Sequence, residues 1–267
     1  MKVALMSDIH ANTHAFEKAI EDAKGHGVES FCILGDIVGY GYDPNGCIDM
    51  ALSLGDNTRF VKGNHDAAVV GELSIDWFST TARNGVIRHR KQVKGNRLDF
   101  LRGLPYTIVD NKNGFVCSHG TLVDPMQFSY MSGIYSCCDN AEEARIMHDA
   151  KVLFCGHTHN AFVYDQLIHG FPDRTICNFD EISNGKDEFV IGNGHTLVVN
   201  TGSVGYPRML GKSVYVIYDT ESCTVSFRIL PFDFEDYIKM LVGSGIQVPG
   251  WVDRWHLATT KGDGDGE

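Results

Sequence analysis

The chain has 267 residues, enough for one large domain or two small ones with a buried core. Hydrophobic residues make up 43% and charged residues 21%, an ordinary composition for a globular protein in water. The net charge of −11 disfavours a long nucleic acid as partner, because phosphate contacts need clustered Lys and Arg. The most basic stretch, residues 88–97, is interpreted as the solvated face of a helix pair.

Cysteine usage and hydropathy indicate where the protein is expected to reside. The eight cysteines include no CxxC pair, the chain enters a strand directly with no signal peptide, and no apolar run approaches ~18 residues. We therefore expect a cytoplasmic protein with reduced thiols and no membrane partner. The adjacent residues Cys137 and Cys138 are either two ordinary thiols or a redox-active or metal-trapping pair.

The first third of the chain alternates short apolar runs with amphipathic segments. The predicted strands cover residues 3–6, 30–36 and 58–66, and the predicted helices cover 13–24 and 43–54. Asn12 or Thr13 is expected to cap the first helix, and Asp43 the second, with Pro44 at its first position. This order predicts a parallel sheet with crossover helices.

The middle of the chain combines helices with strands. Two amphipathic helices broken near Gly95 are predicted over residues 74–104, and a hairpin is predicted over 106–120. A helix predicted at 139–150 leads into a buried strand at 151–159.

From about residue 162 the pattern changes to strands with little helix between them. Strands are predicted at 161–170, 196–203, 213–219 and 223–230. The polar, Gly-rich residues 170–194 are expected to form a long hairpin loop, 234–242 a short helix, and 261–267 a disordered tail. We therefore expect one domain over residues 1–260, made of two packed sheets with helices outside.

Five short motifs each follow a predicted strand. They are DIH at 8–10, GD at 35–36, GNHD at 63–66, SHG at 118–120 and GHTH at 156–159. Any one of them has an ordinary interpretation as a turn or a hydrogen-bonded histidine. Five together favour one shared site, because ligands of α/β sheets bind beyond the carboxyl ends of the strands. The motifs supply nine polar side chains, namely Asp8, His10, Asp36, Asn64, His65, Asp66, His119, His157 and His159.

The residue types indicate a site for divalent metal ions. Mixed carboxylate, imidazole and amide groups suit Mn²⁺, Fe²⁺ or Zn²⁺, and the absence of Cys from the motifs disfavours a structural zinc site. The ligands are too many for one ion. Two ions ~3.5–4 Å apart require a shared carboxylate between them.

The order of these motifs resembles the calcineurin-like metallophosphoesterases from residue 8 to residue 159. The segment GDIVGYGYDPNGCIDM, residues 35–50, is similar to a bacterial subgroup near the YfcE-type and diadenosine-tetraphosphate-hydrolase-like enzymes. The resemblance implies an α/β fold of two stacked mixed β-sheets flanked by helices. It also implies two divalent metal ions as cofactors, with Mn²⁺ as the first candidate and Fe, Zn, Ni or Co as alternatives.

The same resemblance implies the roles of the site residues. It assigns one ion to Asp8, His10 and His159, the other ion to Asn64, His119 and His157, and the bridging position to Asp36. The implied catalytic residues are His65, which would lie beside the substrate phosphate without binding metal, and Asp66, which would orient His65. This chain departs from its relatives at three positions. Relatives often have Pro, Gln and Pro where this chain has Thr201, Tyr206 and Tyr42. These differences are expected to affect the choice of substrate and not the metal site.

Substrate contacts are expected from the segments that border the site. The candidate substrate-binding residues are Asn64 and Arg208. Arg208 is chosen because a guanidinium binds phosphate with two parallel N–H donors and because it is the only cation of the turn at 202–208. The alternative is a surface Arg208 with no role. Tyr40, Tyr42 and Tyr206 either stack on a base or are rim or core aromatics.

These features predict hydrolysis of a small phosphate ester or phosphoanhydride by attack of a metal-bridged hydroxide, without a phosphoenzyme. The first alternative is a metal-dependent nuclease or phosphodiesterase acting on nucleic acid, which the negative charge disfavours. A protein phosphatase is the second. A non-catalytic scaffold of the same fold is the third, and the seven retained ligands disfavour it. The natural substrate, the native metal and the oligomeric state are left open.

Overall fold

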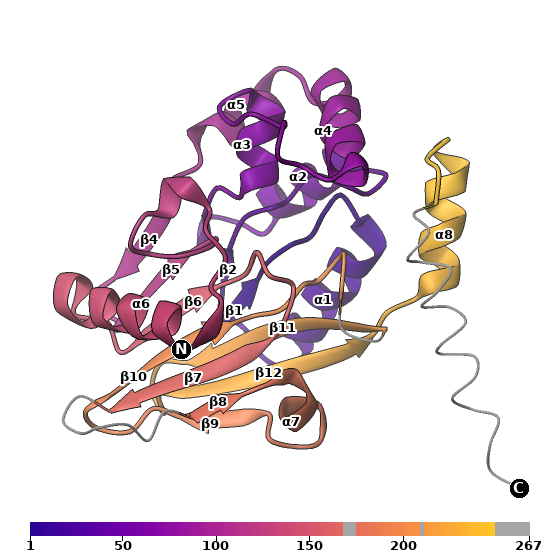
Figure 1. Cartoon of the computed structure of the whole chain (residues 1–267). Helices are drawn as coiled ribbons and strands as arrows, with labels where there is room; N and C mark the ends of the chain where they lie inside the picture. The colour runs from indigo at the N-terminus through magenta and orange to yellow at the C-terminus, as the bar shows by residue number, and fades with distance from the viewer. Residues whose placement is uncertain (168–174, 209–210, 249–267) are drawn as a thin grey trace, which may run out of the picture.

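Two mixed sheets form the centre of the structure, a computed structural model that describes residues 1–167, 175–208 and 211–248 (Figure 1). Across the first sheet lie β3 (Thr58–Phe60), β2 (Ser30–Ile33), β1 (Lys2–Met6), β11 (Lys212–Asp219), β12 (Thr224–Pro231) and β9 (Glu188–Val190). Across the second lie β4 (Thr107–Asp110), β5 (Phe115–Ser118), β6 (Val152–Cys155), β10 (His195–Asn200), β7 (Phe162–Leu167) and β8 (Thr175–Cys177). Strands β1, β2 and β3 are parallel, as are β5, β6 and β10.

Side-chain alternation along the strands builds the apolar layers. Neighbouring side chains of a strand point to opposite faces of the sheet. Leu5 therefore lies in the core between the sheets, whereas Met6 lies in the core shared with α1 (Thr13–Gly25) and α2 (Pro44–Ser53). On the far side, α6 (Gly133–His148) packs on the second sheet. The expected architecture of two stacked mixed sheets flanked by helices is confirmed.

Helices α3, α4 and α5 gather beside α2 at one end of the molecule (Figure 1). Their bounds, with those of the C-terminal helix and one short 3₁₀ helix, are α3 (Asn64–Val70), α4 (Thr80–Gln92), α5 (Asn96–Gly103), α8 (Phe234–Gly243) and η1 (Pro125–Gln127). The break near Gly95 is confirmed. Within the described ranges, none of the helices combines the length and hydropathy needed to cross a bilayer.

The helix caps follow the sequence. Asn12 accepts a hydrogen bond from the backbone N–H of Ala15 at 3.1 Å, and Asp43 accepts one from Gly46 at 2.8 Å. Each cap satisfies a backbone donor that lacks a partner inside the helix. Because Asn12 and Asp43 each stand at the end of a loop beyond a parallel strand, the caps also fix where these loops end.

The loop predicted over residues 170–194 is wrong. Among its described residues the chain forms β8, the helix α7 (Phe179–Ser183) and β9. Asn178 and Glu181 form a capping box, in which each side chain accepts from the other residue's backbone N–H. Strands β8 and β9 pair with β7 and β12, so they complete one edge of each sheet. Each of these edge strands has only three residues, which is too short for a periodic pattern in the sequence to reveal it.

Two predicted boundaries also move. The strand predicted over residues 58–66 ends at Phe60, because α3 begins at Asn64 and its N-terminus is held by Asp66, whose carboxylate accepts from the N–H of Gly63 at 3.0 Å. The helix predicted over 139–150 begins earlier, at Gly133. The predicted tail at 261–267 lies outside the described residues, and the single-domain boundary stays a prediction.

Candidate metal centre

The predicted ligands meet beyond the carboxyl ends of parallel strands. The turn after β1 carries Asp8 and His10, and the turn after β6 carries His157 and His159. The turns after β2, β3 and β5 carry the remaining three, Asp36, Asn64 and His119. Six of these residues, together with His65, form three groups whose donor atoms lie within 4.8 Å of one another, namely Asp8–His10–His159, His10–Asp36–His65 and Asp36–His119–His157. The five motifs therefore converge on one buried site.

The backbone behind these ligands is strained. Five of them have positive φ angles, at Asp8 (55°), His10 (50°), Asp36 (54°), His157 (66°) and His159 (60°). This left-handed region costs a non-glycine residue on the order of 1–3 kcal/mol. Such strain persists only where surrounding contacts over-determine it. Here the turns brace one another through the backbone, as where His10 donates to the carbonyl of Asp36 at 2.9 Å.

The first group of ligands presents lone pairs to a common point. Nδ1 of His10 donates to the carbonyl of Val38 at 3.0 Å, and Nδ1 of His159 donates to that of Tyr206. In the neutral rings each Nε2 then carries a lone pair. The two Nε2 atoms lie 3.2 Å apart, and Oδ1 of Asp8 lies 3.3 Å from that of His159. Oδ1 of Asp8 is buried and has no hydrogen-bond partner among the described residues.

Asp36 lies between the two groups. Its Oδ2 is 3.6 Å from Nε2 of His10 and 3.3 Å from Nε2 of His119. Nδ1 of His119 donates to the carbonyl of Leu34 at 2.7 Å, and its Nε2 lies 3.2 Å from Oδ1 of Asn64. Asp36 thus lies between the two ligand groups, where a shared carboxylate would have to lie, and its bridging role stays a prediction.

These residues fit two divalent ions. The donor set is two carboxylates, four imidazoles and one amide oxygen, which suits borderline divalent cations. Backbone carbonyls hold at least three of the rings by Nδ1, the arrangement that orients histidine ligands in metal sites. A cation also resolves the repulsion among the buried lone pairs and satisfies the orphaned oxygen of Asp8.

Burial and charge set the protonation of the ligands. Burial lowers the pKa of His157 to about 4 and that of His159 to about 3, so both rings are neutral at pH 7. Burial disfavours the charged form of His119 as well, but the Asp36 and Asp8 carboxylates outweigh it and raise its pKa to about 9. Without a metal ion, the protonated ring of His119 therefore supplies the positive charge beside Asp36.

His65 forms a group with His10 and Asp36 but belongs to neither of the groups around Asp8 and His119. Its buried ring is 4.9 Å from the ring of His10 and 4.7 Å from that of Tyr40, and its Nδ1 has no hydrogen-bond partner in the described chain. Space for the ring depends on Gly39, which has φ +96°, because a Cβ there would lie 2.2 Å from Nδ1 of His65. The ring is therefore held in place with a free polar atom, as a group that meets substrate would be.

The expected role of Asp66 is wrong. Its carboxylate accepts backbone N–H groups of Asp36 at 2.8 Å, Val38 at 3.2 Å and Gly63 at 3.0 Å, and it forms no hydrogen bond with His65 in the described structure. A carboxylate with three amide donors fixes the turn that carries Asp36. Asp66 therefore positions Asp36 rather than the imidazole of His65.

Aromatic rings form the walls of the site. Tyr40 and Tyr206 stack with centroids 4.1 Å apart beside His10, whereas the hydroxyl of Tyr42 donates to Asn12 in the core and lies away from the ligands. Tyr130 stacks on His157 at 4.2 Å with an interplanar angle of 12°. The sequence analysis missed Tyr130, because it lies in an irregular segment with no motif around it.

The interpretation of residues 88–97 as a solvated face is wrong for its first residues. His89 is fully buried, accepts from the N–H of Gly39 at 3.0 Å and donates to the carbonyl of Gly41 at 3.1 Å. Arg88 donates to the carbonyls of Tyr40 and Gly41. These side chains of α4 therefore hold the loop that carries Tyr40. The sequence did not indicate this role, because a buried His within a run of basic residues has no distinguishing pattern.

Arg208 lies at the exposed rim of the site. It lines a cleft of about 630 Å³ together with Asn64, His65, Tyr130 and His157. Burial raises the pKa of Tyr40 to about 12, and the positive charge of Arg208 opposes that rise. The structure thus brings together all nine residues predicted for the site and places Arg208 at its opening.

The fold and this ligand set together define a protein of the phosphoesterase type with candidate metal ligands. The chain belongs to the calcineurin-like phosphoesterase superfamily, whose domain model matches residues 1–223 and so spans every predicted ligand. An uncharacterized protein of Methanocaldococcus jannaschii is 28% identical over 253 residues, which are 94% of this chain and 95% of that protein. The expected family is confirmed.

Solved structures share the architecture. A metallophosphoesterase from Sphaerobacter thermophilus aligns with a TM-score of 0.70 and 28% identity, covering 96% of this chain and 98% of its own. A hypothetical protein from Pyrococcus horikoshii OT3 aligns with a TM-score of 0.69 and 19% identity, covering 94% and 95%. A YfcE phosphoesterase from E. coli and a putative diadenosine tetraphosphatase are more distant, with TM-scores of 0.42 and 0.48, 16% and 15% identity, and 87% of this chain covered in each.

We expect Asp36→Asn to weaken metal binding more than any other single ligand change, because Asp36 faces both ligand groups. After Mn²⁺ loading and buffer exchange, elemental analysis should find two ions per wild-type chain and at most one in the variant. Asp139→Asn, an exposed carboxyl on α6, is the matched control and should keep both ions. Two ions retained by Asp36→Asn would contradict the bridging assignment.

The affinity of the wild-type protein for Mn²⁺, measured by metal titration, should depend on pH. Because the pKa of His119 is raised to about 9, a proton must leave this ring before it can bind an ion. The affinity for Mn²⁺ should therefore rise between about pH 6 and pH 9 and fall towards acid. A flat profile over this range would count against His119 as a ligand.

Proposed function

We propose that the protein hydrolyses a small phosphate ester or phosphoanhydride with the help of two divalent ions, of which Mn²⁺ is the first candidate and Fe, Zn, Ni and Co are alternatives. The observation that carries this proposal is the carboxylate of Asp36 between two groups of buried ligands, beside a cleft that Asn64 and His157 line. When bound, such a pair of ions supplies Lewis acidity and an activated water for attack on phosphorus. Family membership supports the same class of reaction.

The chain's own residues position the substrate and its charge. Arg208 at the rim offers a planar fork of donors for phosphate oxygens, and Asn64 offers an amide beside the ligand His119. Burial lowers the pKa of His65 well below its usual value, so its ring enters the reaction neutral. A neutral ring N–H can donate a hydrogen bond to a phosphoryl oxygen, whereas a neutral ring has no extra proton to give to a leaving group.

The cleft and the charge support a small substrate. A volume of about 630 Å³ is typical of small-molecule pockets. Aromatic rings of Tyr40, Phe78 and Tyr130 line it, and its described cation is Arg208. With a net charge of −11, the protein offers little to a long nucleic acid. We therefore propose a small phosphorylated substrate and no polymeric nucleic-acid partner.

We also propose that the protein works in the cytoplasm. All eight cysteines are free thiols, and most are buried in the core. Cys137 and Cys138 follow one another on α6 and form no disulfide. Reduced thiols are typical of reducing compartments. This supports the interpretation of the pair as ordinary thiols.

Chelation should abolish hydrolysis of bis-p-nitrophenyl phosphate, and Mn²⁺ should restore it, because the activated water that would attack phosphorus depends on ions held by the ligand groups. The measurement is release of p-nitrophenolate before and after metal removal, beside a panel of small phosphates and single-stranded DNA. Activity that survives complete chelation would overturn the proposed chemistry. DNA cut faster than every small phosphate would overturn the substrate class.

His65→Gln should keep both ions and lose about 10²–10⁴-fold in kcat, the usual scale for a positioned catalytic group. Elemental analysis and steady-state kinetics on the same preparation separate the two effects. His26→Gln is the control, since this exposed ring lies at the end of α1 away from the site. Loss of metal from His65→Gln would show that His65 is a ligand.

Arg208→Ala should raise KM for a substrate with more than one phosphate more than it raises KM for the nitrophenyl ester, because the guanidinium grips oxygens remote from the reacting phosphorus. Arg208→Lys should recover only part of the loss, since an ammonium lacks the fork. Arg102→Ala, whose surface ion pair with Asp99 lies on α5, is the control. If neither kinetic constant changes on any substrate, Arg208 has no role in binding.

A further inference from the structure

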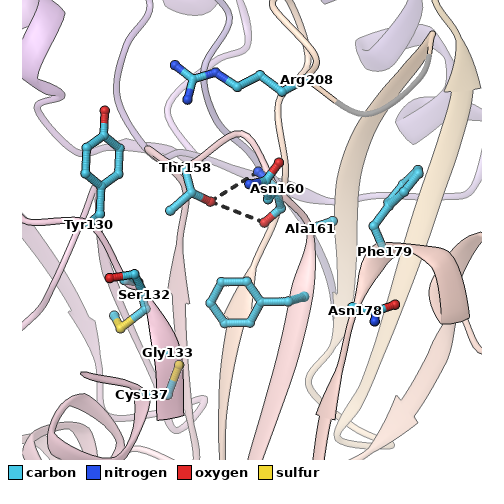
Figure 2. A pocket seen from close by; sticks show the side chains of 12 residues that line it. Tyr130, Ser132, Gly133, Cys137, Thr158, Asn160, Ala161, Asn178, Phe179 and Arg208 are labelled. Carbon is cyan, nitrogen blue, oxygen red and sulfur yellow. Dashed lines mark hydrogen bonds between the residues drawn. The ribbon is translucent and has the colours of Figure 1, made fainter. Parts of the chain in front are cut away.

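A second cavity of about 640 Å³ adjoins the cleft of the metal centre (Figure 2). The two hollows share Tyr130 and Arg208 in their linings. Thr158, which stands between the ligands His157 and His159, also lines the second cavity. A molecule whose phosphate lies at the ligand groups can therefore reach this cavity past Tyr130 and Arg208.

The second cavity has aromatic walls and free amide donors. Phe162 of β7 and Phe179 of α7 line it together with Tyr130. In Figure 2, Phe179 and Asn178 lie across the cavity from Tyr130. Asn178 uses its Oδ1 to cap α7, which leaves its Nδ2 as a donor, and the side-chain amide of Asn160 has no partner among the described residues.

The charge of this cavity differs from that of the protein. None of its described lining residues is Asp or Glu, and Arg208 is the cation among them, although the whole chain has a net charge of −11. A lining without carboxylates spares an anionic ligand the repulsion that most of the surface would impose. The cavity is also within the size range of pockets for small organic ligands.

We propose that the second cavity binds the flat aromatic group of the substrate, and that the substrate is of the nucleotide class, with its phosphate at the metal centre and its base in this cavity. The proposal rests on the proposed function for the place of the phosphate. Aromatic side chains stack on the faces of bases, and amides hydrogen-bond to base edges. Arg208 lies where the phosphate and the base meet.

Three phosphorylated compounds distinguish binding of the base from binding of the rest of the ligand. Adenosine 5′-monophosphate carries a base, ribose 5-phosphate carries the same sugar without a base, and decyl phosphate carries an apolar chain. Titration calorimetry on Mn²⁺-loaded protein should show that adenosine 5′-monophosphate binds at least about tenfold more tightly than ribose 5-phosphate, the scale of one stacked base. Because calorimetry needs no turnover, a protein that binds these ligands without hydrolysing anything would overturn the proposed function and leave the base site standing.

Ser132→Phe places a ring in the cavity from an exposed position at the start of α6. It should bring the affinity ratio of adenosine 5′-monophosphate to ribose 5-phosphate close to one and leave ribose 5-phosphate binding unchanged. Asp139→Phe, exposed on the same helix and outside the cavity, should keep the wild-type ratio. Asn160→Trp enters from another wall and repeats the test if Ser132→Phe has a lowered melting temperature.

Three results would overturn the proposal. A ratio near one in the wild type would mean that no base site exists. A ratio that both filling variants leave intact would place the base elsewhere, for instance in the cleft beside Tyr40. Tighter binding of decyl phosphate than of adenosine 5′-monophosphate would make the cavity a site for an apolar chain.

Discussion

The site depends on a crowding of buried electron pairs that only positive charge can stabilise. Two carboxylates and four imidazoles lie close together in the interior, and Oδ1 of Asp8 faces two Nε2 atoms without a hydrogen to share. Burial by itself would raise the pKa of Asp36, but the positive charge of the His119 ring holds it well below its usual value. Both carboxylates thus stay ionised and ready to bind cations.

The rest of the fold serves to hold these groups against their repulsion. Parallel strands bring the turns together, and five ligands accept left-handed backbone angles to point inward. Asp66 ties the turn of Asp36 to the start of α3, and His89 ties the loop of Tyr40 to α4. Each brace uses a buried polar group whose hydrogen bonds are made, which is the condition for placing such groups in a core.

Two hollows with different linings border the metal centre. The cleft holds His65, Asn64 and aromatic rings, and the second cavity holds amides and rings without carboxylates. Tyr130 and Arg208 stand between them and contribute to both. A substrate that uses both hollows gains contacts on each side of its phosphate, which is how binding energy remote from the reacting atom can favour one substrate over another.

The sequence by itself determined which side chains meet at the candidate site and the two-sheet fold, because each of these side chains follows an apolar run and strand ends meet by a general rule of α/β folds. Helix caps such as Asp43 were equally local. Only the tertiary structure decided that Asp66 braces Asp36, that His89 is a clamp inside a basic run, that Tyr130 stacks on His157, and that α7 lines the second cavity. These contacts join segments far apart in the chain, and the identity of a partner across such a distance leaves no periodic or local pattern in the sequence.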